Sequence, residues 1–542
     1  MPVLASKVDT TADLYKANRD AQLALIAEFR AAEQRVRDNS ARQAEKFAKR
    51  GQLLPRDRIA RLLDRGSPFL ELSTLAGYQM HDDDGRSDAA GGGNISGIGY
   101  VSGVRCMVGA SDSAIKGGSV APMGLKKSLR AQEIALQQKL PAVTLVESAG
   151  ANLLYQAEIF VEGGRVFANM ARLSAAGIPQ VTVVHGSSTA GGAYLPGLSD
   201  YVIAVRGHAK VFLAGPPLVK AAIGEDADDE ALGGAELHAT VTGTAEYIAE
   251  NDAHAIHLAR QILTNLSNSA FTQFNAPVGP RPHRPPRHDI DELLGIVSPD
   301  FKKPYDAREV IARLVDDSDF LEFKTLYGPA TVCGHAAIEG HSVGILANNG
   351  PITPDGATKA GHFIQLCCQS GTPILYLQNT TGYMVGTAAE RAGMVKHGSK
   401  MIQAVANATV PQITLIIGGS FGAGNYGMCG RSYDPRFVFA WPGSRIAVMG
   451  GEQAAKVMEI ITVAKFARMG VQPDADAMAA MGKSIRDKLD AESTAYYATA
   501  RLWDDGIIDP RDSRTVLAHA LAICRESAAR TLRPNTFGVA RL

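Results

Sequence analysis

Short apolar runs alternate with longer amphipathic stretches along most of this chain. The runs Ala142 to Val146 and Ile178 to Val184 are rich in valine and lie next to proline or glycine, which is typical of buried strands. The stretch from Leu125 to about Lys139 has the length and spacing of a helix. Strands and helices in this order predict an α/β fold with crossover connections.

The strand-to-turn pattern occurs twice, 232 positions apart. In both places an apolar strand leads into a run of small residues, Gly186 to Tyr194 in the first and Gly418 to Tyr426 in the second. The offset holds without a gap back to Gly150 and Gly382. A second block, Ile59 to Leu72, recurs as Ile311 to Phe323 at an offset of 252 that slips by one residue. Two ordered blocks predict an internal duplication.

A proline-rich stretch separates the two copies. Five prolines fall between Asn275 and His288, and we predict a linker over residues 275–303. The expected organisation is an N-terminal helical segment at 1–50, a first domain at 51–274 and a second domain at 304–542. The C-terminal region from about 479 to 532 has a helical pattern that is interrupted near Pro510.

Composition argues against several classes of function. The chain has 542 residues, and 55 Lys and Arg balance 55 Asp and Glu, so no net field would attract nucleic acid or an anionic membrane. No uncharged apolar run reaches the roughly 18 residues of a membrane span. The six cysteines lack metal-binding spacing, and no apolar signal core opens the chain. We therefore expect reduced thiols, no metal site and a cytoplasmic location.

The glycine turns are the main candidates for chemistry. At Gly191 and Gly192 the missing side chains would let backbone N–H groups approach a substrate oxygen. Ala423 and Gly424, flanked by Gly422, hold the equivalent positions. One such donor to an oxyanion contributes about 3–4 kcal/mol to the transition state, so two turns predict a reaction with two negatively charging oxygens. A tight helix–strand contact would also need small residues, and this alternative stays open.

Conventional catalytic motifs are absent from the sequence. The run from Gly186 is not a GxSxG nucleophile elbow, and no Walker A, dinucleotide-binding or HExxH pattern occurs. Glu147 and Asp112 end apolar strands, where a capping or positioning role competes with that of a general base.

A local basic cluster stands out against the neutral total. Lys116, Gly117 and Gly118 form a predicted loop, and Lys126 and Lys127 open the helix that follows. Together they could bind a polyphosphate such as that of coenzyme A, although a solvated helix face is the simpler interpretation of a lysine pair.

A set of motifs resembles the carboxyltransferase (β) subunit of biotin-dependent acyl-CoA carboxylases over nearly the whole chain. Tyr433 to Phe437 and Met449 to Ala454 resemble the branch that acts on 3-methylcrotonyl-CoA and geranyl-CoA. The other matching segments are Ala110 to Ser119, Lys126 to Ile134, Ala214 to Ala222, Leu232 to His238, Asn379 to Gly386, Lys396 to Met401 and Gly418 to Asn425.

The resemblance implies two tandem crotonase-like domains, each a ββα superhelix, with acyl-CoA on the first and biotin on the second. It implies that Gly191 and Gly192 donate to the thioester enolate oxygen and that Ala423 and Gly424 donate to the biotin ureido oxygen. The implied lining residues are Ala149 and Gly150 on the acyl-CoA side and Gly382, Tyr383 and Gly422 on the biotin side.

The same resemblance accounts for the missing base. Carboxybiotin would release CO2, its ureido nitrogen would take the substrate proton, and the γ-carbon of an α,β-unsaturated acyl-CoA would capture the CO2. The chain has no ATP-grasp pattern and no Met-Lys-Met biotinylation motif. The family therefore implies a partner α subunit with biotin carboxylase and biotin carrier functions, and a β6 core within an α6β6 enzyme.

One region departs from the methylcrotonyl pattern. Ala168 stands where that branch has a bulky aromatic residue, an exchange that removes on the order of 100 Å³ from a pocket wall. This favours geranyl-CoA over 3-methylcrotonyl-CoA, unless Met170 fills the space. More remote alternatives are a crotonase-type hydratase or isomerase using Glu147 and Glu158, the carboxyltransferase of a decarboxylating sodium pump, and a non-enzymatic scaffold.

Overall fold

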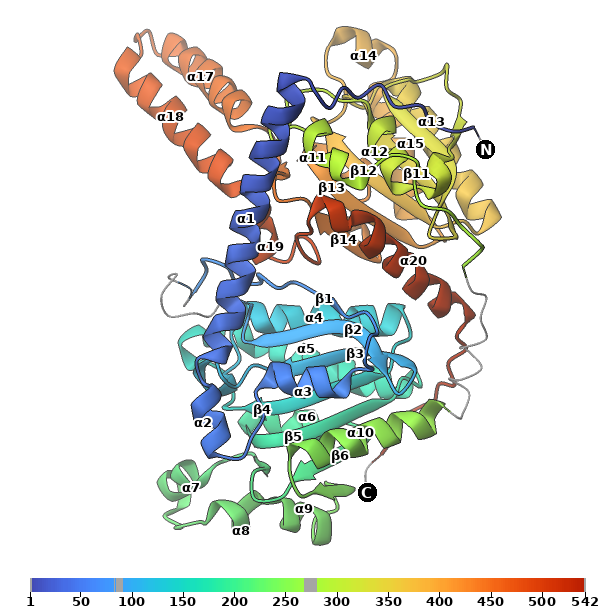
Figure 1. Ribbon diagram of the computed structural model, residues 1–542. Helices are drawn as coiled ribbons and strands as arrows, with labels where there is room; N and C mark the ends of the chain where they lie inside the picture. The colour runs from blue at the N-terminus through green and yellow to red at the C-terminus, as the bar shows by residue number, and fades with distance from the viewer. Residues whose placement is uncertain (1, 82, 84–90, 268–279, 541–542) are drawn as a thin grey trace. The chain divides into compact units, whose positions relative to one another are not determined.

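The computed structural model describes residues 2–81, 83, 91–267 and 280–540 of the chain (Figure 1). The chain divides into two compact units. We call Ala31–Val278 with 500–502 and 523–542 the N unit, and Met1–Arg30 with 279–499 and 503–522 the C unit. These units differ from the expected domain boundaries at the chain ends, because residues 2–30 belong to the C unit and residues 523–540 belong to the N unit.

The N unit is built on an eight-stranded sheet with the order β1-β2-β3-β4-β5-β6-β8, in which β7 pairs with the end of β5. The first three strands are antiparallel, and β3 to β6 and β8 are parallel to one another. The strands are β1 (Leu70–Glu71), β2 (Asn94–Val101), β3 (Val104–Ser111), β4 (Ala142–Ser148), β5 (Gln180–Thr189), β6 (Tyr201–Val205), β7 (Lys210–Phe212) and β8 (Tyr247–Ala249).

The C unit repeats this arrangement in a seven-stranded sheet with the order β9-β10-β11-β12-β13-β14, in which β15 pairs with the end of β13. The strands are β9 (Leu321–Phe323), β10 (Thr331–Ile338), β11 (His341–Asn348), β12 (Ile374–Thr380), β13 (Gln412–Phe421), β14 (Phe437–Ala440) and β15 (Arg445–Ala447).

The register of the two sheets is also repeated. In the N unit, β4 and β5 pair regularly until a register shift, after which Ser148 pairs with Ser188. In the C unit the same shift precedes the pairing of Thr380 with Ser420. The predicted fold class, two crotonase-like α/β domains related by duplication, is therefore confirmed.

Helices cover both faces of the N-unit sheet (Figure 1). The helices α3 (Pro55–Leu62) and α10 (Asp252–Ser267) pack on one face, over a core of valine, isoleucine and leucine that includes Val143 and Val183. On the other face lie α4 (Pro122–Gln137) and α5 (Gln156–Ala175). Helix α4 starts three residues before its predicted position because Pro122 fits the first turn of a helix.

In the C unit, α13 (Pro354–Ser370) and α15 (Met394–Ala406) hold the places of α4 and α5. The short helices α7 (Pro216–Ile223) and α8 (Asp229–Gly233) follow β7, whereas the long pair α17 (Gly451–Arg468) and α18 (Ala475–Glu492) follows β15. The remaining α-helices are α1 (Asp13–Ala41), α2 (Ala44–Lys49), α6 (Tyr194–Gly197), α9 (Ala235–Thr240), α11 (Leu293–Ile296), α12 (Ala307–Leu314), α14 (Thr387–Arg391), α16 (Gly422–Gly427), α19 (Ala495–Ala500) and α20 (Ser513–Ala529).

The predicted linker is more ordered than its prolines suggest. Its residues 275–279 lie outside the described part of the chain. From about residue 290 onward the segment packs into the C unit, where Leu293 and Leu294 are fully buried. Asn18 on α1 donates a hydrogen bond to the Gly295 carbonyl at 3.1 Å. The second half of the predicted linker is therefore part of the C-unit core.

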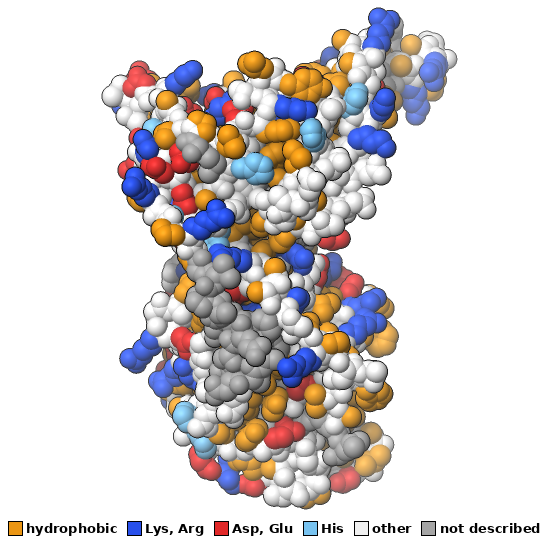
Figure 2. All heavy atoms as spheres, turned by 90° about the vertical axis from the view of Figure 1, so that its right-hand side faces the viewer, with side chains coloured by type: hydrophobic (Ala, Val, Ile, Leu, Met, Phe, Trp, Pro, Cys, Tyr) orange, Lys and Arg blue, Asp and Glu red, His pale blue; other side chains and the backbone are white. Residues whose placement is uncertain are grey.

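Charged side chains of both signs are interspersed over the face drawn in Figure 2, in agreement with the balanced composition. None of the helices in the described ranges is long and apolar enough to cross a membrane. No disulfide joins any of the six cysteines, all of which are described.

Candidate active site

The first glycine turn follows the end of β5. Residues Ala190–Ala193 form one 3₁₀ turn that leads directly into α6. Ala190 has a left-handed backbone with φ of 54°, and this turns the chain sharply out of the strand. Gly191 is exposed and Gly192 is buried. A β-carbon on Gly192 would lie 3.3 Å from the side chain of Ser148, so the turn packs closely on the end of β4.

The end of β4 completes this first site. Gly150 has φ of 88°, and its N–H donates to Ser148 Oγ at 3.2 Å. Its carbonyl accepts a hydrogen bond from the Val120 N–H at 2.9 Å. Gly118 approaches so closely that an added β-carbon would lie 2.1 Å from the Glu147 carbonyl oxygen. The structure thus brings the predicted residues Gly118, Gly150 and Gly192 together around Ser148.

Ala149 and Gly117 join the same group. Both are exposed, and a β-carbon on Gly117 would lie 3.9 Å from the β-carbon of Ala149. Two chain segments that are distant in sequence therefore present backbone and small side chains at one surface beside the turn.

The second glycine turn repeats this geometry in the C unit. Gly422 has φ of 53° at the start of α16, Ala423 is exposed and Gly424 is buried. A β-carbon on Gly424 would lie 2.8 Å from the Cα of Gly382, so this contact requires glycine. The Gly382 N–H donates to Thr380 Oγ1 at 3.2 Å, in the same way as Gly150 donates to Ser148.

Hydroxyl groups that the sequence analysis did not single out support both turns. Ser188 Oγ donates to the Gly192 carbonyl at 2.8 Å. Ser420 at the equivalent position accepts a hydrogen bond from Asn425 Nδ2 at 2.7 Å. Both serines are completely buried. The 232-residue offset relates Ser188 to Ser420, and this was the available signal for their role.

Tyr383 contributes to the second site through its backbone and its packing. Its hydroxyl donates to the Gly398 carbonyl at 3.4 Å, and its ring lies against Gly398 and Gly427. Burial raises the pKa of the Tyr383 hydroxyl well above its usual value. The phenol therefore stays neutral and anchors the loop after Gly382 to α15 and α16.

Glu147 is held in a buried ionic network and does not point to an open site. Its carboxylate accepts hydrogen bonds from Arg58 Nη1 at 3.0 Å and Ser113 Oγ at 2.8 Å. Arg58 is 1% exposed and also binds Asp252 at 2.9 Å. This network ties α3 and α10 to the end of β4. The other carboxylate of the hydratase alternative, Glu158, lies on α5 and pairs with His81 at 3.1 Å.

The network has a second arm on β5. His185 is fully buried, and its Nδ1 lies 2.7 Å from Asp252 Oδ1. Burial raises the pKa of the Asp252 carboxyl, but the hydrogen bond from His185, the charge of Arg58 and the Leu53 N–H together lower it to about 2. Burial lowers the pKa of His185, so the imidazole is neutral at pH 7. The arrangement fixes the strands below the turn and offers no general base.

The predicted basic cluster separates into two parts. Lys116, next to Gly117, and Lys126, at the start of α4, are both exposed. Lys127 is buried, with its ammonium 2.9 Å from the Asn94 carbonyl and 3.3 Å from the Gly91 carbonyl. Because its hydrogens are directed at buried backbone, the predicted phosphate contact does not apply to Lys127.

Ala168 does not occupy the place that the sequence comparison suggested. It is half-buried on α5 and does not line the cavity of the N unit, whereas Val166 and Met170 do. Its neighbour Phe167 faces the turn, where its ring lies 3.6 Å from a β-carbon built on Gly191 and 5.4 Å from the Tyr194 ring. The helical phase therefore directs Phe167 to the site and Ala168 away from the cavity.

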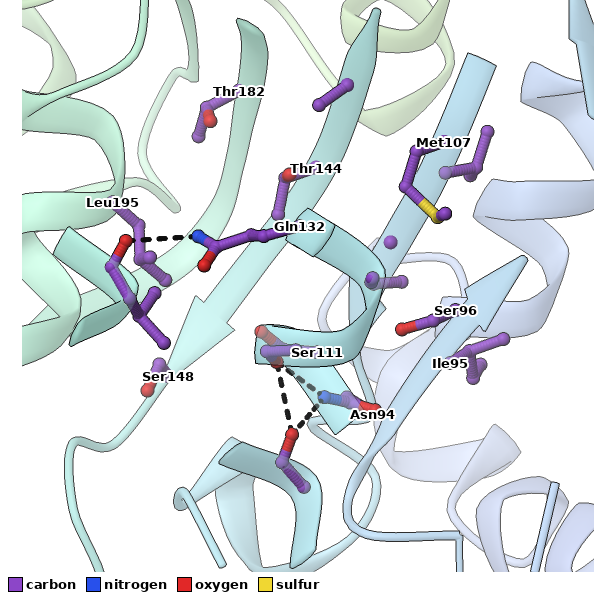
Figure 3. Close-up of a pocket in the computed structure, with 18 of the residues that line it drawn as sticks. Asn94, Ile95, Ser96, Met107, Ser111, Gln132, Thr144, Ser148, Thr182 and Leu195 are labelled. Carbon is purple, nitrogen blue, oxygen red and sulfur yellow. Dashed lines mark hydrogen bonds between the residues drawn. The ribbon is translucent and has the colours of Figure 1, made fainter. Parts of the chain in front are cut away.

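Each turn lies beside a cavity within its own unit. In the N unit a cavity of about 160 Å³ starts at Ser148 and Gly118 and continues between the sheet and the helices α4 and α5 (Figure 3). In the C unit a wider cleft of about 1410 Å³ reaches Thr381 and Phe421 and extends between α17 and α18. The described ranges contain no group of three or more side chains arranged to hold a metal ion.

The sequence profile of the carboxyl transferase domain matches residues 46–539 of this chain. The chain belongs to the carboxyl transferase family. It is a carboxyltransferase of the biotin-dependent acyl-CoA carboxylases, as the sequence motifs predicted.

This carboxyltransferase is similar to several individual proteins over most of its length. It is 48% identical to the probable methylcrotonoyl-CoA carboxylase beta chain of Drosophila melanogaster, over 100% of this chain and 95% of the relative. It is 50% identical to a probable biotin-dependent acyl-coenzyme A carboxylase beta2 subunit of Mycobacterium tuberculosis, over 91% of each chain. The crystal structure of the P. aeruginosa geranyl-CoA carboxylase beta subunit matches with a TM-score of 0.93, 60% identity and 100% coverage of both chains.

Proposed function

We propose that this carboxyltransferase moves CO2 from carboxybiotin to the γ-carbon of geranyl-CoA. The main observation behind the proposal is the pair of equivalent turns at Gly192 and Gly424. A buried serine makes a hydrogen bond within each turn, and each turn packs on the end of the neighbouring strand. A reaction between two bound species, each of which develops an oxyanion, needs two such donor sites. The 60% identity to a geranyl-CoA carboxylase beta subunit supports the substrate.

The N-unit turn is proposed to bind the thioester. The N–H groups of Gly191 and Gly192 belong to the first turn of a helix, at its positive end, and that of Gly191 has no intrahelical acceptor. They would stabilise the substrate enolate oxygen, and the hydrogen bond from Ser188 would keep the turn in place. Ala149, Gly150, Gly117 and Gly118 would form the wall beside the acyl-CoA.

The C-unit turn is proposed to bind the biotin ureido group. The residues fit this group, because a side chain on Gly424 would collide with the backbone of Gly382, Gly382 itself has φ of 123°, and the adjoining cleft is large enough for a bicyclic ring. When bound, carboxybiotin supplies the CO2 and the ureido nitrogen that acts as base. Ala423 and Gly424 would donate N–H groups to its oxygen, with Gly422 and the Tyr383 loop as walls.

Lys116 and Lys126 are proposed to contact the phosphates of coenzyme A. Lys116 adjoins Gly117 and Gly118, Lys126 is exposed at the start of α4, and an ammonium group acts as a point charge for phosphate. Lys127 is left out because of its buried carbonyl contacts.

The proposal requires partner subunits. A biotin-bearing α subunit would supply carboxybiotin, and we propose a β6 core within an α6β6 enzyme. The cysteines without disulfides support a reducing compartment, and we propose the cytoplasm.

The second candidate substrate is 3-methylcrotonyl-CoA. It is favoured by the 48% identity to a methylcrotonoyl-CoA carboxylase beta chain over the whole length of this chain. The proposed reaction is the same, and only the acyl chain differs.

The deciding experiment is ATP-dependent fixation of labelled bicarbonate by the complex of this chain with its biotin-bearing α subunit. Geranyl-CoA and 3-methylcrotonyl-CoA are compared by their kcat/KM values, and omission of biotinylation is the control. We expect the higher value for geranyl-CoA. A preference for 3-methylcrotonyl-CoA would make the second candidate correct, and biotin-independent hydration of either thioester would contradict the carboxyltransferase mechanism.

A further inference from the structure

Several side chains that line the cavity of the N unit are replaced by larger ones in the duplicated C unit, although the two folds share their strand register. Gly109 pairs with Thr144 in the N unit, and Leu346 pairs with Tyr376 at the same register of the C unit. Leu346 and Tyr376 are completely buried in the C-unit core. In the N unit glycine and threonine therefore line an open space, and in the C unit leucine and tyrosine occupy the equivalent place.

The covering helix α4 shows the same difference. Ala131 on α4 lines the cavity, and the residue 232 positions later on α13 is Phe363, which is completely buried. The second covering helix does not show this difference, because Met170 corresponds to the smaller Val405. The two residues are equivalent because the carbonyl of each accepts a hydrogen bond from the equivalent glutamine side chain. Since larger buried side chains occupy the equivalent places on β11, β12 and α13, the cavity results from the small side chains of the N unit and is not a requirement of the fold.

The position of the cavity connects it with the first turn. Ser148, Ser111 and Asn94 lie at one end, and Ser148 is the residue against which Gly192 packs. From there the cavity follows β4 toward its first residue, past Thr144, and reaches Met107 and Met170 (Figure 3). A chain that leaves the thioester beside Ser148 would thus run under α4 and α5 toward flexible apolar side chains.

The size of the cavity matches one isoprene unit. Its volume is about 160 Å³. A protein cavity of roughly 150 Å³ accommodates a benzene molecule, which is similar in size to an isoprene unit. Geranyl-CoA exceeds 3-methylcrotonyl-CoA by one isoprene unit at the end remote from the thioester. The shared head of both substrates would remain at the turn, and only the longer chain would enter.

We infer that the cavity between the N-unit sheet and helices α4 and α5 receives the distal isoprene unit of the acyl chain and sets the chain-length preference. This inference rests on the proposed function, because it names the place of the substrate's tail at the same site. Residues Ala131, Ala135 and Ala142 are the specificity-determining positions, because a larger side chain at each would occupy the space.

The test is to fill the cavity with larger apolar side chains. Ala135→Leu acts from α4, and Ala142→Ile copies Ile374, which holds the equivalent place on β12. Ala171→Leu is the matched control, because Ala171 is exposed on α5 and does not line the cavity. Each variant is assembled with the α subunit, checked by gel filtration and thermal unfolding, and assayed with both thioesters.

We expect kcat/KM for geranyl-CoA to fall at least about tenfold in each filled variant, the discrimination typical of a changed apolar pocket, while the value for 3-methylcrotonyl-CoA is unchanged. The variants should unfold at the same or a higher temperature, because filling a cavity stabilises a core. If Ala135→Leu fails to assemble, Ala142→Ile decides.

Unchanged geranyl-CoA turnover in an assembled variant would overturn the inference, and so would an equal loss with both thioesters. These outcomes differ from failure of the proposed function. In that case the wild-type complex itself would not carboxylate geranyl-CoA.

Discussion

Ala190 and Gly422 have the same left-handed backbone conformation at equivalent places in the two units, with φ of 54° and 53°. Each is followed by an exposed residue and a buried glycine, and each begins the turn that presents backbone N–H groups. A residue with a side chain adopts this conformation at a cost of about 1–2 kcal/mol. The N unit therefore retains strain at Ala190 that the C unit avoids with glycine.

This difference predicts opposite effects of reciprocal substitutions. Ala190→Gly should leave the free energy of unfolding unchanged or raise it by up to about 1 kcal/mol, because the strain is relieved. Gly422→Ala should lower it by about 1–2 kcal/mol, since the new β-carbon would also lie 3.1 Å from the Val448 carbonyl. Thermal unfolding of the two variants measures this. Equal destabilisation by both would show that local strain does not govern the turns.

The two buried glycines should differ in their tolerance of alanine. A β-carbon on Gly424 would lie 2.8 Å from backbone, whereas one on Gly192 would lie no closer than 3.3 Å to any atom, the nearest being those of the Ser148 side chain. Gly424→Ala should therefore displace its N–H and lower kcat by about 10²–10³-fold, with a smaller loss for Gly192→Ala. The measurement is steady-state carboxylation.

Gly361→Ala is the matched control for this pair, because no atom lies closer than 3.8 Å to its added β-carbon. Wild-type kcat in Gly424→Ala would argue against a catalytic role for the second turn.

Glu147→Gln should retain most of the carboxylation activity with an unchanged pH profile. The amide oxygen can still accept hydrogen bonds from Arg58 and Ser113, and the network positions β4 without moving a proton. Loss of a true general base would cost about 10²–10⁴-fold. The kcat/KM for the acyl-CoA, measured across pH, is the test. A loss of that size with a missing limb in the pH profile would restore the hydratase-type role of Glu147.

Substitutions of Lys126 and Lys127 should have different effects, the first on acyl-CoA binding and the second on stability. Lys126→Met should raise KM for the acyl-CoA several-fold at low salt and leave thermal unfolding unchanged, because its exposed charge is proposed to contact phosphate. Lys127→Met should lower the unfolding temperature, since two buried carbonyl groups lose their donor. Identical effects of the two substitutions would contradict this assignment.

The pH dependence of stability should also reveal the lowered pKa of Lys127. Burial lowers its pKa from 10.5 to about 8, so the unfolded chain binds more protons between these values. Wild-type stability should therefore rise relative to Lys127→Met from about pH 8 to 10.5, by about 3 kcal/mol at most. Unfolding in denaturant at several pH values measures the difference. A constant difference across this range would mean that Lys127 titrates normally.

The sequence predicted those parts of the candidate site that are formed by residues adjacent in the chain. Gly191, Gly192 and Gly424 could be found because a strand followed by small residues specifies its own turn. The predictions that Lys127 contacts phosphate and that Ala168 lines the acyl pocket do not agree with the structure. Adjacent residues on a helix point about 100° apart, so Lys126 faces solvent and Lys127 faces backbone. Their adjacency in the sequence did not show which of the two side chains faces solvent.

The sequence by itself determined the α/β order, the duplication, the two turns and the motifs of the family, because these depend on periodicity and on segments that are contiguous in the chain. The crotonase-like fold followed from the resemblance of those motifs to the family. Only the tertiary structure decided that Glu147 is bound by Arg58, that Ser188 supports the turn and that a cavity lies under α4 and α5. Those features depend on side chains from segments far apart in sequence. Their distances and the space between them exist only after the sheet and helices have packed.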